Sequence, residues 1–152
     1  MLDLSLNQSN ANSHSKASLR SNDINSARTI LAVDDEYDIV NLIKLSLEID
    51  GQRVCIFTDP LTALAHFNNS DPKDYHHIVI SDIRMPGMNG YEFVNHVKKI
   101  DPKVKVILMS AFELNDSESS NLAIDAFIKK PFSLITLNNV VKQQYKQIVN
   151  LM

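Results

Sequence analysis

The sequence predicts an α/β domain in which helices cover a five-stranded parallel sheet. Three observations predict this fold. Short apolar runs alternate five times with stretches of helical periodicity, the apolar runs show no polar alternation, and helix-capping residues lie in the turns between them. Continuous apolar runs are typical of parallel strands buried on both faces, and right-handed crossovers are expected to connect them.

The predicted strands are short and rich in aliphatic residues. The first is Thr29-Ile30-Leu31-Ala32-Val33, and the others follow at 53–57, 78–81, 104–109 and 126–129. The segments between them are long enough to hold a helix each. A connection between parallel strands needs a crossover of this kind.

Five helices are predicted from capping residues and from apolar residues at helical spacing. The first ends at the Gly51 turn, and the second begins at Asp59-Pro60, where an N-cap Asp precedes a Pro in the first helical position. The third begins near Gly90, the fourth lies within 116–124, and the fifth begins near Leu134. The apolar faces are Ile39, Val40, Ile43 and Leu47 in the first helix, Phe93, Val94, Val97 and Ile100 in the third, and Leu137, Val141, Tyr145 and Ile148 in the fifth.

Composition divides the chain into two parts. Residues 1–28 are dominated by Ser and Asn and contain no aromatic residue, so they bury too little apolar surface to offset the entropy of ordering. We therefore predict a disordered tail over 1–28 and one folded domain over 29–152. A chain of 152 residues is long enough for one domain with a hydrophobic core and short for two.

Charge and hydropathy argue against several classes of protein. The net charge of −3 disfavours nucleic-acid binding, which usually depends on a basic surface that neutralises phosphates. No apolar stretch approaches the roughly 20 residues of a membrane span. The N-terminus has no signal-peptide core, so we expect a cytoplasmic protein that does not bind a membrane. The single cysteine, Cys55, excludes an internal disulfide and is interpreted as a small core residue.

Polar residues follow four of the predicted strands at the point where each strand ends. Asp34 and Asp35 follow the first strand, Asp82 the third, Ser110 the fourth and Lys130 the fifth. In an open parallel sheet, ligands bind outside the carboxyl ends of the strands, so these side chains are expected in one crevice. Three carboxylates there repel one another unless a divalent cation, a lysine or both lie between them.

These residue types favour a hard cation and a phosphoryl group. Carboxylate oxygens suit Mg²⁺, and the predicted crevice contains neither Cys nor His, so zinc is not expected there. Lys130 supplies a positive charge and Ser110 a hydroxyl, which together with a carboxylate nucleophile suit the binding of a phosphoryl group. His76 and His77 precede a strand and are interpreted as loop residues rather than as metal ligands.

Four short motifs lie at these strand ends: VDDE at 33–36, SDIRMPGMNG at 81–90, MSA at 109–111 and FIKKPF at 127–132. Each motif alone is common in unrelated proteins. Together and in this order they resemble the response-regulator receiver family of two-component signalling. The resemblance covers the chain from about Arg28 to the C-terminus and implies the flavodoxin-like, doubly wound strand order 2-1-3-4-5.

The resemblance implies a chemical role for each matching residue. Asp82 would be the phosphoacceptor that attacks the phosphorus of a kinase's phosphohistidine. Lys130 would pair with Asp82 and then with the phosphoryl group. Ser110 would turn to hydrogen-bond a phosphoryl oxygen, and Phe127 would rotate inward as Ser110 moves.

The resemblance also implies a Mg²⁺ site. The implied ligands are Asp35, Asp82 and the backbone carbonyl of Arg84, with Asp34 acting directly or through water. The Lys130-Pro131 bond resembles the family's cis peptide.

The sequence departs from the family pattern in two places. Residues 122–126 are LAIDA, where a Gly-Ala turn is usual, and the segment between the fourth and fifth strands is shortened. Both affect the fourth helix and the partner surface.

The implied partners are a histidine kinase or phosphotransfer protein as phosphodonor and a downstream protein. The downstream partner would dock on the face formed by the fourth helix, the fifth strand and the fifth helix. The chain would be a monomer or a phosphorylation-dependent homodimer. It would promote its own phosphotransfer and autodephosphorylation and would not be a dedicated enzyme.

Other functions remain open from the sequence alone. The chain could be a phosphorelay intermediate without conformational output, or a receiver fragment of a longer regulator, although its length and tail favour a short natural chain. A phosphatase of the haloacid-dehalogenase type needs a second acid two residues after the nucleophile, and Arg84 stands there. A flavin or dinucleotide binder needs a glycine-rich loop after the first strand, and all three glycines lie elsewhere.

Overall fold

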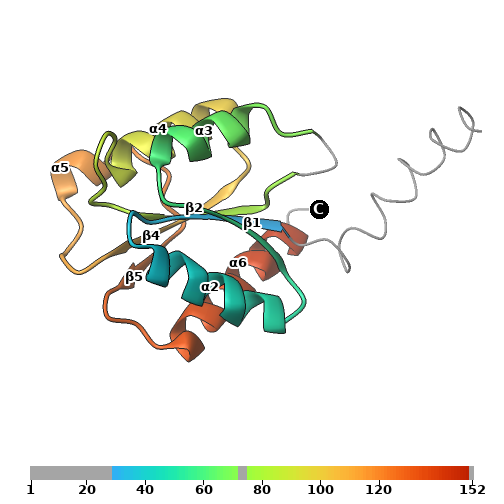
Figure 1. Cartoon of the computed structure of the whole chain (residues 1–152). Helices are drawn as coiled ribbons and strands as arrows, with labels where there is room; N and C mark the ends of the chain where they lie inside the picture. The colour runs from blue at the N-terminus through green and yellow to red at the C-terminus, as the bar shows by residue number, and fades with distance from the viewer. Residues whose placement is uncertain (1–28, 72–74, 151–152) are drawn as a thin grey trace, which may run out of the picture.

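The computed structural model describes residues 29–71 and 75–150, so the predicted tail over 1–28 lies outside the described residues. Five strands form one parallel sheet in the order β2-β1-β3-β4-β5, which confirms the predicted order. The sheet is central and runs through the middle of the molecule (Figure 1). The strands are β1 (Thr29–Val33), β2 (Arg53–Phe57), β3 (Ile78–Asp82), β4 (Lys105–Ser110) and β5 (Ala126–Lys129).

Helices alternate with the strands along the chain and cover both faces of the sheet (Figure 1). One face carries α2 and α6, and the other carries α3, α4 and the short α5. Among residues 29–71 and 75–150, no helix is long and apolar enough to cross a membrane. The helices are α2 (Tyr37–Ile49), α3 (Pro60–Asn68), α4 (Gly90–Ile100), α5 (Asp116–Ser119) and α6 (Leu134–Asn150).

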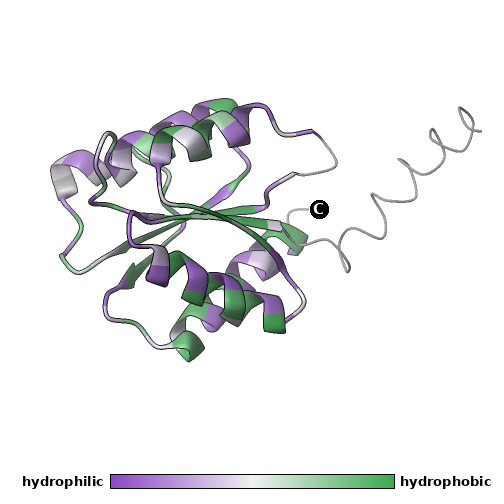
Figure 2. Ribbon diagram, in the orientation of Figure 1, coloured by the Kyte–Doolittle hydropathy of each residue, from purple (hydrophilic) through white to green (hydrophobic). Residues whose placement is uncertain are grey.

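Each face of the sheet has its own hydrophobic core, because successive side chains of a strand point to opposite faces. In β1, Ile30 belongs to the cluster that contains Ile43 of α2, whereas Leu31 belongs to the cluster that contains Phe93 of α4. All five residues of β1 are buried. Figure 2 shows hydrophobic residues concentrated in the strands, with hydrophilic residues on the outer sides of the helices. The continuous apolar runs therefore reflect burial on both faces.

Local signals set several helix boundaries as predicted. The Asp59 carboxylate accepts the backbone N–H of Thr62 at 3.1 Å, and Pro60 is the first residue of α3. Gly51 has φ +84° in the turn after α2, a conformation that glycine adopts without steric cost. The fourth helix, expected within 116–124, is only the four residues of α5. After α5, Leu122 and Ile124 pack against the core on the α3–α4 face without forming part of a helix.

Asp125 fixes the start of β5 against β4. Its backbone N–H donates to the Val106 carbonyl at 3.0 Å, and its Oδ2 accepts the Val106 N–H at 2.8 Å. Lys98 Nζ lies 3.2 Å from Oδ2, and Lys105 Nζ lies 3.6 Å from Oδ1. All three charged side chains are mostly buried. This network occupies the place of the Gly-Ala turn whose absence was noted in the sequence.

We predict that Asp125→Ala lowers the free energy of unfolding by about 1–3 kcal/mol, because it removes the acceptor of a backbone N–H and of two mostly buried ammonium groups. Urea unfolding measures the change. Asp50→Ala is the matched control, since Asp50 is 36% exposed and lies 3.9 Å from Lys142. An exposed pair of this kind contributes about 1 kcal/mol or less. Equal losses in the two variants would contradict the structural role of Asp125.

Candidate functional site

Asp34 is held at the carboxyl end of β1 by three elements of the fold. Its side chain is fully buried, and its Oδ1 accepts the backbone N–H of Glu36 at 3.0 Å. Its Oδ2 accepts a hydrogen bond from Lys130 Nζ at 2.6 Å. Its own backbone N–H donates to the Phe57 carbonyl in β2 at 3.2 Å. These bonds satisfy a buried carboxylate that would otherwise be costly.

Lys130 joins the ends of β1 and β3. Its Nζ lies 3.3 Å from Asp82 Oδ1, so it pairs with Asp82 as expected, and it lies closer still to Asp34, at 2.6 Å from Oδ2. The Lys130 N–H donates to the Ser110 carbonyl at 2.8 Å, which places the lysine directly beyond the β4–β5 pairing. The bond from Lys130 to Pro131 is cis, as the resemblance implies.

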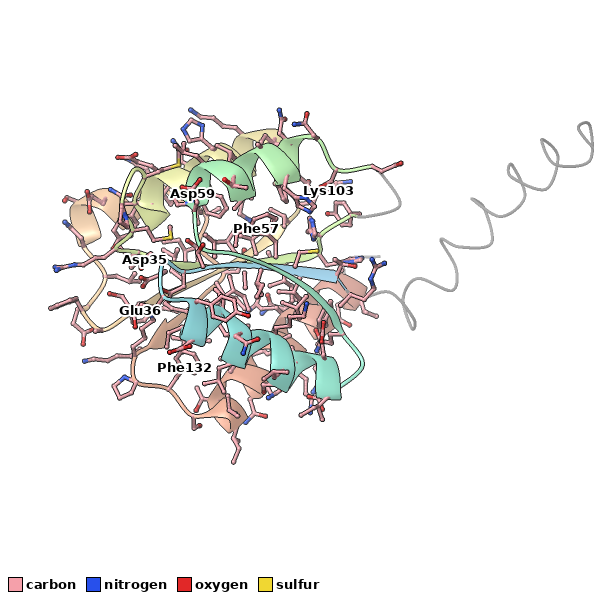
Figure 3. The ribbon with its side chains drawn as sticks, in the orientation of Figure 1. Asp35, Glu36, Phe57, Asp59, Lys103 and Phe132 are labelled. Carbon is pink, nitrogen blue, oxygen red and sulfur yellow. The ribbon has the colours of Figure 1, made fainter. Side chains whose placement is uncertain are left out.

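Asp35 completes a group of three carboxylates at this edge of the sheet. One oxygen each of Asp34, Asp35 and Asp82 lies within 4.8 Å of the other two. Asp34 and Asp82 are buried, whereas Asp35 is exposed and leaves the group open to solvent. Figure 3 shows Asp35 beside Glu36 at this end of β1. Oxygen donors that converge on an open side fit a hard divalent cation such as Mg²⁺.

The electrostatics of this group make Asp82 the carboxylate that needs a cation. Burial raises the pKa of Asp82, the negative charge of Asp34 raises it further, and Lys130 partly offsets both. Burial lowers the pKa of Lys130, but its hydrogen bond to Asp34 and the charges of both aspartates outweigh burial, so the net shift is upward. Lys130 therefore stays an ammonium at neutral pH. A divalent cation beside Asp82 would favour its ionised, nucleophilic form.

Ser110 ends β4 with its hydroxyl engaged in the following turn. Its Oγ accepts the backbone N–H of Phe112 at 3.0 Å, and its side chain is buried. The guanidinium carbon of Arg84 lies 3.9 Å from the centre of the Phe112 ring, within the range of a cation–π contact. Phe112 thus connects the loop after β3 with the loop after β4. The sequence analysis missed this residue, because a lone aromatic in a loop carries no periodic signal.

Two residues of α4 that were not predicted as site residues shape the site. A Cβ at Gly90 would collide with the backbone of Asp82 and Ile83, so only glycine allows α4 to begin this close to β3. The Tyr91 hydroxyl accepts the Asn115 N–H at 2.9 Å and ties α4 to the loop before α5. Gly90 lies within the 81–90 motif, which could have identified it. The Tyr91 contact depends on tertiary packing alone.

The remaining predicted site residues are placed as follows. Phe127 lies in β5, is half-buried and packs against the core on the α3–α4 face. Its inward rotation stays a prediction. Arg84 lies two residues after Asp82 with its side chain exposed, and metal binding by its carbonyl also stays a prediction.

Asp35→Ala is predicted to lower Mg²⁺ affinity at least tenfold, or about 1.4 kcal/mol, because it removes the exposed oxygen donor of the group. Without metal, the variant should be more stable than the wild type, since one of three mutually repelling charges is gone. A Mg²⁺ titration and urea unfolding measure the two effects. Unchanged Mg²⁺ affinity would contradict the ligand role, whereas an apo variant less stable than the wild type would contradict only the repulsion.

A model of the response regulator receiver domain matches residues 30–142 of the chain. The chain belongs to this family. Among curated relatives, this receiver domain is 30% identical over 123 residues to the response regulator SaeR of Staphylococcus aureus. That match covers 77% of this chain and 52% of SaeR, so the chain spans about half the length of the curated relatives it matches.

Solved receiver structures share the fold of this receiver domain. A CheY-like receiver domain protein from Methanospirillum hungatei has a TM-score of 0.77 and 28% identity, with coverage of 84% of this chain and 100% of that one. The response regulator TrrA of Thermotoga maritima, solved in complex with Mg²⁺ and BeF, has a TM-score of 0.68 and 31% identity, with coverage of 77% and 98%. Domains of this family are phosphoacceptor switches of two-component systems and interact with histidine kinases or phosphotransfer proteins.

Proposed function

We propose that Asp82 takes a phosphoryl group from the phosphohistidine of a histidine kinase or phosphotransfer protein. A carboxylate oxygen of Asp82 forms the new bond to phosphorus, the bond from phosphorus to the imidazole nitrogen breaks, and the imidazole leaves with its electron pair. The observation that carries this proposal is the position of Lys130 Nζ, 3.3 Å from Asp82 Oδ1 and 2.6 Å from Asp34 Oδ2. A fixed ammonium beside the nucleophile can pair with the transferred oxygens.

The three carboxylates fit Mg²⁺ by the chemistry and closeness of their oxygens. The proposed ligands are Asp35, Asp82 and the backbone carbonyl of Arg84, with Asp34 binding directly or through water. When bound, the ion would supply positive charge for the phosphoryl oxygens. Because Asp34 is already engaged by Lys130 and by the N–H of Glu36, we assign it the further role of positioning Lys130.

The domain would promote its own phosphotransfer and the later hydrolysis of its acyl phosphate, without being a dedicated enzyme. We place this exchange in the cytoplasm, where ATP-dependent kinases phosphorylate their histidines. The proposal is tested by incubating the full chain with Mg²⁺ and acetyl phosphate and measuring its intact mass. A gain of about 80 Da, one phosphoryl group, supports it. No gain over a range of donor concentrations and times would contradict it.

Phosphorylation is also proposed to switch the surface formed by α5, β5 and α6. Ser110 would release the Phe112 N–H and turn to a phosphoryl oxygen, and Phe127 would move into the space that Ser110 leaves. This surface, together with the loop between β4 and α5, presents large apolar side chains to solvent, with exposed fractions of 54% at Phe112 in that loop and 74% at Ile135 of α6. It could therefore receive a downstream protein or a second phosphorylated copy. A relay intermediate without output remains the alternative.

We predict that beryllofluoride, a phosphoryl mimic, changes amide chemical shifts throughout residues 111–149. The physical reason is that the mimic draws Ser110 Oγ away from the Phe112 N–H, so the turn between them must rearrange. Ser110→Ala should confine the changes to the neighbours of Asp82, because Ala cannot bond to the mimic. A two-state domain responds only to a ligand that favours one state. Local changes in the wild type, unaltered by Ser110→Ala, would favour the relay alternative.

A further inference from the structure

A second cluster of metal-binding side chains lies away from the acidic edge of the sheet. It consists of Cys55 in β2, His66 in α3 and His76 in the segment before β3. One ligand atom of each residue lies within 4.8 Å of the other two, and the Nε2 atoms of the two histidines are 3.1 Å apart. Two nitrogens bound to one tetrahedral Zn²⁺ are about 3.3 Å apart, so a small shift would admit the ion.

Aromatic rings hold the two imidazoles in place. The Phe57 and His66 ring centres are 5.0 Å apart, and Phe67 stacks on His76 at 6.1 Å. Figure 3 shows Phe57 between α3 and the sheet, which is the side on which this cluster lies. The Ser70 hydroxyl donates to the His66 carbonyl at 2.6 Å and secures the end of α3. The ligand positions thus belong to a packed part of the domain rather than to a loop tip.

The burial of the three side chains suits a site with one open position. His76 is 2% exposed, whereas Cys55 and His66 are half-buried. A hydrogen bond between the two imidazoles would account for their closeness without any metal. The Cys55 Sγ lies within the same 4.8 Å and adds a third donor atom to the two imidazoles. A thiol and two imidazole nitrogens around one point form a donor set for a borderline-soft cation.

We propose that Cys55, His66 and His76 bind one divalent cation of the Zn²⁺ class, with water in the fourth position. The thiol loses its proton to solvent as the metal–sulfur bond forms. His76 lies six residues before Asp82, outside β3, and Cys55 pairs with Leu31, three residues before Asp34, so this site is separate from the acidic site and has no carboxylate ligand. The proposal assigns a metal role that the sequence-based interpretation of Cys55 as a core residue and of His76 as a loop residue did not include. Bound metal would tie α3 to β2 and to the start of β3.

Cobalt titration of the full chain tests the site. Excess Mg²⁺ is added first to occupy the acidic edge, and absorbance is followed as Co²⁺ is added. The chain contains one cysteine, so a sulfur-to-cobalt charge-transfer band can arise only from Cys55. We expect this band to saturate at one Co²⁺ per chain, to disappear on addition of Zn²⁺ and to be absent in Cys55→Ser. Zn²⁺ should raise the melting temperature of the wild type but not of Cys55→Ser.

His66→Gln and His76→Gln should each weaken Co²⁺ binding at least about tenfold. His96→Gln, at an exposed position of α4, should leave binding unchanged. Circular dichroism and the phosphoryl mass gain show whether each variant is folded. The absence of the band in the wild type would overturn the proposal irrespective of the variants. So would a band that survives both histidine substitutions, or one that saturates at one Co²⁺ per two chains.

Discussion

Asp82→Asn is expected to abolish phosphorylation by acetyl phosphate, with no mass gain under conditions that fully label the wild type. Its amide lacks the anionic oxygen that must attack phosphorus, although it has nearly the same shape and leaves Lys130 paired with Asp34 at 2.6 Å. Asp38→Asn, an exposed position in the first turn of α2, is the matched control and should be labelled normally. Full labelling of Asp82→Asn would move the phosphoacceptor to another residue.

The same variant should be more stable than the wild type at pH 7 without divalent cations. Because the pKa of Asp82 is raised on folding, the folded state binds its proton more tightly than the unfolded chain does. Ionising Asp82 therefore costs stability as the pH rises from the ordinary pKa of 3.8 through the folded-state pKa, and the cost is complete above that range. The advantage of Asp82→Asn should vanish below about pH 3.8. Mg²⁺ should also reduce it, since the ion stabilises the wild type more.

Lys130→Met is expected to lower the free energy of unfolding by about 3 kcal/mol in the absence of divalent cations. The substitution keeps the volume of the side chain but removes the ammonium that lies 2.6 Å from a fully buried carboxylate. Of the two donors to the Asp34 carboxylate described above, the Lys130 ammonium would be lost and the Glu36 N–H would remain. A loss of this size is a large fraction of the stability of a typical domain. Urea unfolding at low ionic strength measures it.

Lys129→Met is the matched control for this experiment. Lys129 pairs with Glu113 at 2.6 Å, but both side chains are more than half exposed, so the loss should be about 1 kcal/mol or less. The double variant Asp34→Asn with Lys130→Met should recover most of the stability lost in Lys130→Met, because it also removes the unpaired charge. A loss in Lys130→Met no larger than in Lys129→Met would show that the ammonium does not compensate the buried carboxylates.

The Asp125 network and the length of α5 could not be predicted from the sequence. Continuous apolar runs identified every strand, and the Asp59 cap with Pro60 located the start of α3, because these signals act within a few residues. The four residues of α5 form about one helical turn, which is too short to show a helical periodicity of apolar residues. From the sequence, Asp125 could be recognised only as a residue that replaces part of a glycine-containing turn. Its ion pairs could not be predicted, because Lys98 and Lys105 are distant from it in sequence.

The sequence by itself determined that Asp34, Asp35, Asp82 and Lys130 would meet. Each follows a continuous apolar run, and parallel strands bring their carboxyl ends to one edge. Only the tertiary structure decided that Lys130 lies closer to Asp34 than to Asp82 and that Ser110 Oγ is bonded to the Phe112 N–H. It alone brought Cys55, His66 and His76 together. Hydrophobic periodicity specifies which face of an element is buried, whereas distances between side chains of different elements depend on how those faces pack.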